Sequence, residues 1–133
     1  MSNGRELATC VHGTMSITIA EVNDQILVKW DGVFDVFNPH PILNEFFAKQ
    51  EPLLRGKAVL LDFSQTEFIN SATLSVILQL VKLLDTSVAK LTIKYDTRES
   101  WQMVSFRCMK AISRTLKNTD IVAVGSSGSA QPV

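Results

Sequence analysis

Residues 59–84 have the sequence VLLDFSQTEFINSATLSVILQLVKLL, in which a short apolar run, a polar segment and a long apolar run follow one another. The first run has the length of a buried strand and the second that of a helix, with a loop of about six or seven residues between them. Because residues 57–63 are almost continuously apolar, we expect a central, parallel strand there. Ser75, Gln79 and Lys82 form one narrow polar stripe on the helix, which predicts that its other sides are covered.

The junction between this loop and this helix carries Asn70, Ser71 and Thr73. Unpaired backbone N–H groups and the positive end of the helix dipole lie at such a junction. A hydroxyl there can cap the helix, accept a phosphate or contact a partner, and a simple helix cap also accounts for these residue types. We therefore expect residues 70–74 to lie at the surface, with Ser71 within one residue of the cap.

Two blocks of this stretch resemble the signature of the STAS family, the anti-sigma-factor antagonist domains. That signature is an apolar strand ending in Leu-Asp-Leu-Ser, then Phe-(Ile/Met)-Asp-Ser-(Ser/Thr)-Gly-Leu at the start of a helix. The chain has LDFS at residues 61–64 and FINSATL at residues 68–74, with the family's spacing between them. Three positions differ: Asn70 stands where the family has Asp, Ala72 where it has the phosphorylated Ser or Thr, and Thr73 where it has Gly.

The resemblance implies a bacterial regulatory module that binds a signalling protein, such as an anti-sigma-type kinase, through the loop and helix start. The partner-binding residues that it implies are Asn70, Ser71, Ala72, Thr73 and Leu74. In the family, phosphorylation of the hydroxyl beside the Asp puts charge into the interface and releases the partner. Ala72 cannot accept that phosphate. The chain is then either a permanently unmodified binder, which we favour, or it carries the switch at Ser71 or Thr73.

A second interpretation makes the domain a small-ligand or lipid sensor. Some STAS-like domains are thought to hold a metabolite or lipid in the apolar crevice between sheet and helices, so the resemblance permits this function. Neither the composition nor the residue spacing singles out a ligand pocket.

The order of apolar patterns predicts a single-domain α/β fold, STAS-like, with a mainly parallel sheet and the element order ββαβαβαβ. Residues 1–14 are expected to be a tail, residues 15–124 the domain, and residues 125–133 a flexible C-terminal tail. The expected strands are residues 15–22, 25–30, 57–63, 89–95 and 121–124. Three helices are expected. The first begins at Pro39 and Pro41, runs to about Gln50 and is ended by Pro52 and Gly56. The other two cover residues 74–84 and 101–116.

Two further groups of residues have both a structural and a functional interpretation. Arg107, Lys110, Arg114 and Lys117 would form a basic stripe on the last helix, either a solvated face or a docking surface for an acidic partner. Phe34 and Phe37 lie in an expected loop, where they either cover the core or form a binding patch.

Composition and motifs exclude several classes of function. The 133 residues are 46% hydrophobic with a formal net charge of zero, which suits one globular domain and gives no global attraction to nucleic acid or anionic membranes. The chain lacks a signal peptide pattern and a transmembrane stretch, so we expect a soluble cytoplasmic protein. No catalytic motif or phosphate-binding loop is present, and His12 and His40 lack ligand spacing, so neither an enzyme nor a cofactor or metal site is expected. Cys10 and Cys108 are expected to be free thiols, with Cys108 buried.

Overall fold

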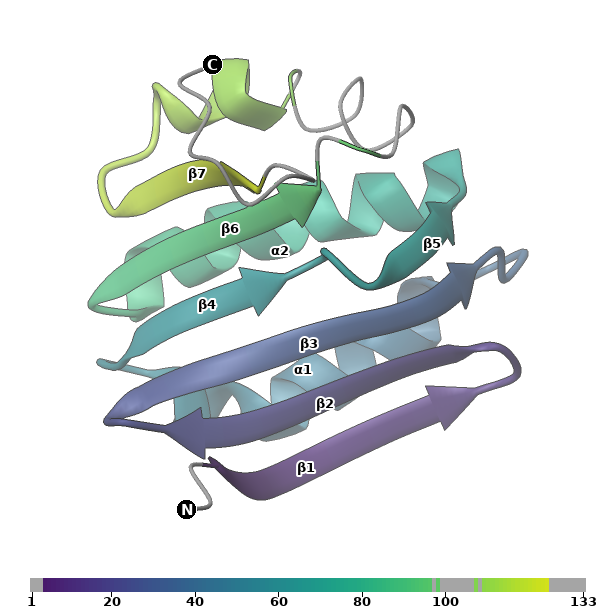
Figure 1. Ribbon diagram of the computed structural model, residues 1–133, viewed down its shortest axis with the longest axis horizontal. Coiled ribbons are helices and arrows are strands. Elements are labelled where there is room, and N and C mark those ends of the chain that lie inside the picture. The colour runs from purple at the N-terminus through teal and green to yellow at the C-terminus, as the bar shows by residue number, and fades with distance from the viewer. Residues whose placement is uncertain (1–3, 97, 99–106, 108, 125–133) are drawn as a thin grey trace.

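The structure, a computed structural model, describes residues 4–96, 98, 107 and 109–124 and forms one mixed α/β domain around a seven-stranded sheet (Figure 1). The α/β class expected from the sequence is confirmed. The strands are β1 (Gly4–His12), β2 (Met15–Val22), β3 (Gln25–Phe34), β4 (Ala58–Asp62), β5 (Thr66–Ile69), β6 (Lys90–Asp96) and β7 (Thr119–Val124). The helices are α1 (His40–Leu54) and α2 (Ser71–Ser87), and residues 109–113 are also helical.

The sheet combines an antiparallel half with a parallel half. Its order is β1-β2-β3-β4-β6-β7, and β5 pairs with β3 beyond the end of β4. Strands β1, β2 and β3 are antiparallel neighbours, whereas β4, β5, β6 and β7 all join the sheet through parallel pairings. Helices α1 and α2 lie on the same face of the sheet (Figure 1).

The strands expected over residues 15–22 and 25–30 are present as β2 and β3, and a tight turn at Asn23 and Asp24 joins them. Both residues have positive φ, 53° and 66°, and they join β2 to β3. Consecutive positive φ values are those of a type I′ turn, whose twist matches that of the flanking strands. Asn and Asp tolerate this conformation better than other residues with a side chain.

The prediction of an N-terminal tail over residues 1–14 is wrong for most of that range. Residues 4–12 form β1, which pairs with β2 along the edge of the sheet and has a bulge between Glu6 and Ala8. The bulge breaks the strict alternation of apolar and polar residues by which a strand is recognised in a sequence. Cys10, expected in that tail, lies half-buried in β1 as a free thiol.

Two further boundaries differ from the expected ones. Residues 66–69 were expected in a loop but form β5, and α1 continues past Pro52 to Leu54. A proline this close to the end of a helix removes only one backbone hydrogen bond. The completely buried side chain of Leu54 holds the final turn against the core. The expected helix over 101–116 and the tail over 125–133 fall largely outside the described residues, as does Cys108.

The core lies between the sheet and its helices and contains an aromatic cluster around Trp30. The indole is fully buried and stacks on Phe63 and Phe47, with ring centroids 4.9 Å and 5.5 Å away. Phe34 lies 5.7 Å away in a tilted arrangement. Because these rings come from β3, α1 and the end of β4, the cluster fixes α1 and the carboxyl end of β4 against β3.

The buried carboxylate of Asp85 holds the C-terminal end of α2. Asp85 is only 5% exposed and accepts hydrogen bonds from the backbone N–H groups of Lys117 and Asn118, at 3.1 Å and 2.7 Å, and from the Thr119 hydroxyl at 2.7 Å. Burial alone would raise the pKa of this carboxyl, but the hydrogen bonds outweigh burial and lower the pKa below its usual value. Asp85 therefore joins α2 to the start of β7.

We expect Asp85→Ala to lower the free energy of unfolding by about 2 to 4 kcal/mol at pH 7, because several buried donors lose their acceptor. The folded-state pKa is below the unfolded one, so this stabilisation is present above about pH 4 and is lost as the pH falls through the folded-state pKa. Urea unfolding at pH 7 and at lower pH measures both effects. An equal loss at each pH would contradict the assignment, and Asp24→Asn, at an exposed turn position, is the matched control.

Candidate functional site

The start of α2 is held by three hydrogen bonds of Asn70. Its Oδ1 accepts from the Thr73 backbone N–H at 2.9 Å and caps the helix. Its Nδ2 donates to the Val36 carbonyl at 3.0 Å, and its backbone N–H donates to the Phe34 carbonyl at 2.9 Å. An Asp at this position could cap the helix but could not donate to Val36. Asn70 therefore ties the helix start to the segment that follows β3.

The helix start predicted at residues 70–74 is confirmed, since Asn70 is the N-cap and Ser71 is the first residue of α2, but the prediction that all five residues lie at the surface is wrong for Thr73. Ser71 and Ala72 are exposed, whereas Leu74 is half-buried. Thr73 is completely buried, and its hydroxyl faces the Phe34 carbonyl at 3.5 Å. A kinase cannot reach a buried hydroxyl without local unfolding, so of the two candidate phosphorylation sites only Ser71 is presented at the surface.

Exposed aromatic side chains lie close to this helix start. Phe37, in the segment between β3 and α1, is 96% exposed, and Phe68 on β5 is 45% exposed. Phe37 directly follows Val36, whose carbonyl accepts the Asn70 hydrogen bond, and Phe68 lies two residues before Asn70. Phe34, by contrast, is fully buried in the aromatic cluster. The sequence alone could not show that Phe34 is buried and Phe37 exposed.

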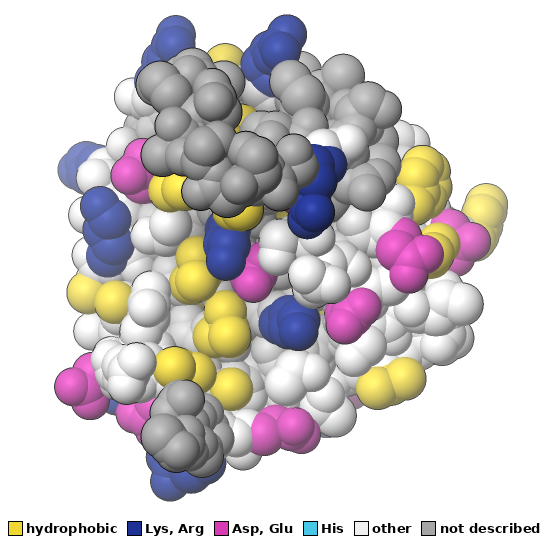
Figure 2. Space-filling view, viewed as in Figure 1, with side chains coloured by type: hydrophobic (Ala, Val, Ile, Leu, Met, Phe, Trp, Pro, Cys, Tyr) yellow, Lys and Arg dark blue, Asp and Glu magenta, His cyan; other side chains and the backbone are white. Residues whose placement is uncertain are grey.

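Acidic side chains accompany the aromatic ones. Asp35, two residues before Phe37, and Glu67, next to Phe68, are both exposed. Hydrophobic and acidic side chains lie together at the right of Figure 2, where Figure 1 shows the ends of β3 and β5. Segments 11–14, 31–38 and 64–75, which form this end of the molecule, contain no Lys or Arg.

A polar pocket of about 360 Å³ lies beside this end, and Asp31, Glu67, Asp96 and Arg98 are among its lining residues. The Arg98 guanidinium binds both carboxylate oxygens of Asp96 and holds the pKa of that carboxyl below its usual value, against the opposing effect of burial. Asp96 is 2% exposed. The pair neutralises the charge of Asp96, whereas the pocket lining also carries the carboxylates of Asp31 and Glu67, and the hydrogen bonds of the pair stabilise the chain just after β6.

The predicted basic stripe is only partly present as a helical surface. Arg107 and Lys110 are helical and exposed, but Arg114 lies in a turn. Lys117 lies beyond the helical residues, in the segment whose backbone bonds to Asp85. The helix ends before Arg114, so the regular spacing expected over four basic residues does not extend along one helix.

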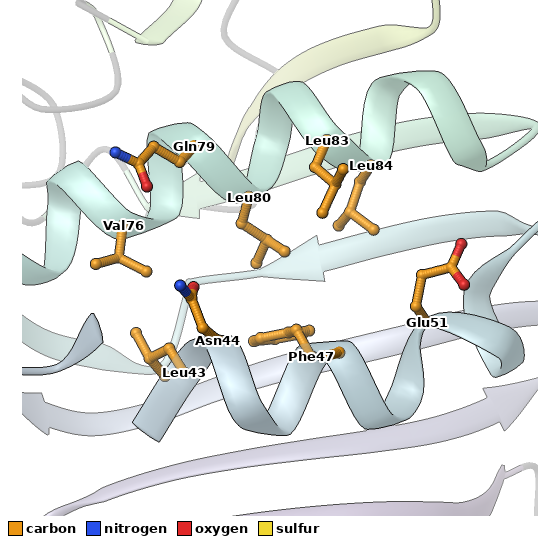
Figure 3. A pocket seen from close by; sticks show the side chains of 10 residues that line it. Leu43, Asn44, Phe47, Glu51, Val76, Gln79, Leu80, Leu83 and Leu84 are labelled. Atoms are coloured by element: carbon orange, nitrogen blue, oxygen red, sulfur yellow. The ribbon is translucent and has the colours of Figure 1, made fainter. Parts of the chain in front are cut away.

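A groove of about 370 Å³ lies between α1 and α2. Figure 3 shows Val76, Leu80 and Leu84 of α2 directed towards Phe47 of α1, with Glu51 at one end. Leu83, on the rim, is 58% exposed. The groove is therefore apolar along most of its length, and it lies between the two helices rather than between sheet and helices.

A metal-ligand group and a membrane-spanning helix are both absent from the described part of the chain. Among residues 4–96, 98, 107 and 109–124, no group of three or more His, Cys, Asp or Glu side chains is placed to hold a metal ion. None of the described helices is both long and apolar enough to cross a membrane. No family model matches the chain, and no curated protein matches it in sequence.

Asn70 provides a direct test of how the helix start is held. We expect Asn70→Ala to lower the free energy of unfolding by about 1 to 3 kcal/mol, because it removes both the cap and the bond to Val36. Asn70→Asp should have a smaller effect, since it keeps the cap. Chemical denaturation compares both with Ser71→Ala, an exposed neighbour. Equal stability of Asn70→Ala and Ser71→Ala would contradict the described role.

Proposed function

We propose that the protein is a non-catalytic regulatory module of the cytoplasm that binds a signalling protein through the start of α2. The supporting observation is that Ser71 and Ala72 are exposed on a helix start held by three hydrogen bonds of Asn70. A surface that is already ordered loses little conformational entropy on binding. The resemblance of residues 61–64 and 68–74 to the STAS signature favours the same surface and a signalling partner, such as an anti-sigma-type kinase.

The proposal includes binding without the family's phosphorylation switch. Ala72 occupies the position of the phosphorylated hydroxyl, and Thr73 is buried beneath it in the helix start. Ser71 is exposed and is the remaining hydroxyl at which a relocated switch would act. Intact-protein mass spectrometry of the chain from its native host tests this part: we expect no stoichiometric phosphate, and a phosphorylated Ser71 would replace permanent binding with a relocated switch.

A bulky residue at the helix start should block the partner without unfolding the domain. We expect Ala72→Trp to abolish capture of the partner from a native-host extract, because Ala72 is exposed and the indole would occupy the contact. Thr86→Trp is the matched control, since Thr86 is exposed about 21 Å further along α2 at 1.5 Å per residue. Quantitative mass spectrometry of the captured proteins compares the two variants with the wild type. An identical set of proteins on all three would contradict the proposal.

The second candidate, a small-ligand or lipid sensor, is favoured by the groove between α1 and α2. Its volume of about 370 Å³ falls within the range of small-molecule sites, and its lining is mostly aliphatic. Glu51, a charged lining residue, is paired with Arg55. An apolar chain is therefore the kind of ligand that the groove would accept.

Thermal unfolding with a panel of medium- and long-chain fatty acids tests this candidate. A ligand that binds only the folded state raises the unfolding midpoint by mass action. Leu83→Glu should remove the shift, because Leu83 lines the groove and is 58% exposed, so the charge is tolerated by the fold. Thr86→Glu adds the same charge outside the lining and should keep the shift. An unchanged midpoint with every fatty acid would exclude these ligands.

A further inference from the structure

Phe37 is the most exposed large hydrophobic side chain among the described residues. Its exposure of 96% contrasts with the complete burial of Phe34 three residues earlier. The segment that carries it is nevertheless anchored, because the carbonyls of Phe34 and Val36 both accept hydrogen bonds from Asn70. An anchored backbone has little conformational freedom to lose when a partner covers it, so binding would order mainly the side-chain torsions of Phe37. Aromatic side chains are also enriched at the centres of protein interfaces.

The charge around Phe37 restricts what could cover it. Asp35 lies two residues before it and Glu67 is on β5 next to Phe68, and both carboxylates are exposed. Lys29 lies further back on β3, and Arg98, which lines the same pocket as Glu67, has its guanidinium bound to Asp96. The segment of Phe37 and the neighbouring strand β5 thus each carry an exposed carboxylate. Phosphate groups of nucleic acids and anionic lipid headgroups would be repelled there.

We infer that this end of the molecule binds a basic protein surface, with Phe37 as the anchor that enters an apolar pocket of the partner and Asp35 and Glu67 facing its Lys or Arg side chains. The inference rests on the proposed function and specifies the chemistry of the partner. Charge complementarity carries it, because opposite charges across an interface favour the correct partner and speed association. The segment that carries Asp35 and Phe37 is hydrogen-bonded through Val36 to Asn70, two residues before Ala72, which favours one partner covering this segment and the helix start.

Selection from a displayed library of random peptides tests this inference even while the natural partner is unidentified. The wild-type chain is the target, and only peptides that also bind an unrelated immobilised protein are removed. We expect the selected peptides to be enriched in Lys or Arg together with apolar residues. Their affinity should fall about tenfold or more on Phe37→Ala, as for an interface anchor. It should fall severalfold on Asp35→Asn/Glu67→Gln, and also when salt is raised from roughly 50 to 500 mM.

Two control variants separate these effects from general ones. Leu53→Ala removes another exposed apolar side chain, in the last turn of α1, and Asp24→Asn removes an exposed acid from the β2–β3 turn at the opposite end of β3. Both should leave peptide affinity unchanged. Selected peptides without excess positive charge, affinities indifferent to Phe37→Ala, or the absence of any selected peptide would each overturn the inference.

The outcome also separates this inference from the proposed function on which it rests. If Ala72→Trp blocks peptide binding and Phe37→Ala does not affect it, the proposed binding surface at the start of α2 stands and the role of Phe37 as an anchor is overturned. Peptides unaffected by both variants would count against both. Sedimentation of the chain alone over a range of concentrations detects self-association. An assembly dissolved by Phe37→Ala would make a second copy the occupant and overturn the inference of a separate basic partner.

Discussion

The stacking of Trp30 on Phe63 and Phe47 holds β3, α1 and the end of β4 together, and the rest of the fold depends on this contact. Strand β3 pairs with β4 over Gln25 to Lys29 and with β5 from Gly32 onward, and Trp30 lies at the gap between these two pairings. Phe63 stacks on the indole as the chain leaves β4, and the Thr66 hydroxyl then donates to the Trp30 carbonyl at 2.7 Å. The chain is thereby returned to β3, and β5 leads directly into the cap of α2.

The candidate site follows from this arrangement because its parts belong to one connected unit. The end of β3 supplies two carbonyls to Asn70, so the segment bearing Phe37 and the start of α2 share their hydrogen bonds. The far end of α2 is held by Asp85. A helix fixed at both ends presents its first residues in a constant orientation, which is what recognition of a partner requires.

The sequence predicted those parts of the fold that local patterns determine. The β4 and α2 patterns, a helix cap within one residue of Ser71 and the strands over residues 15–22 and 25–30 all reflect periodicity or backbone preference within a few residues. Strand β5 was missed because it pairs with β3, which is distant in sequence, and β1 was missed because its bulge interrupts the alternation, although its partner β2 follows it directly. Side-chain exposure was the least predictable property. Thr73 is polar yet fully buried, and Phe37 is apolar yet almost fully exposed, because tertiary contacts decide each case.

Strand β1 has a consequence for the behaviour of the chain when it is shortened or cleaved. Residues 4–12 cover the hydrogen-bonding edge of β2, which otherwise carries the alternating apolar residues Ile17 and Ile19 beside unpaired amides. An exposed edge of that kind can pair with another chain and begin aggregation. β1 itself is a poorer template, since it carries the bulge and an ion pair between Arg5 and Glu21. Proteolysis within the first dozen residues would therefore leave most of the core in place while converting a stable sheet edge into one that recruits other molecules.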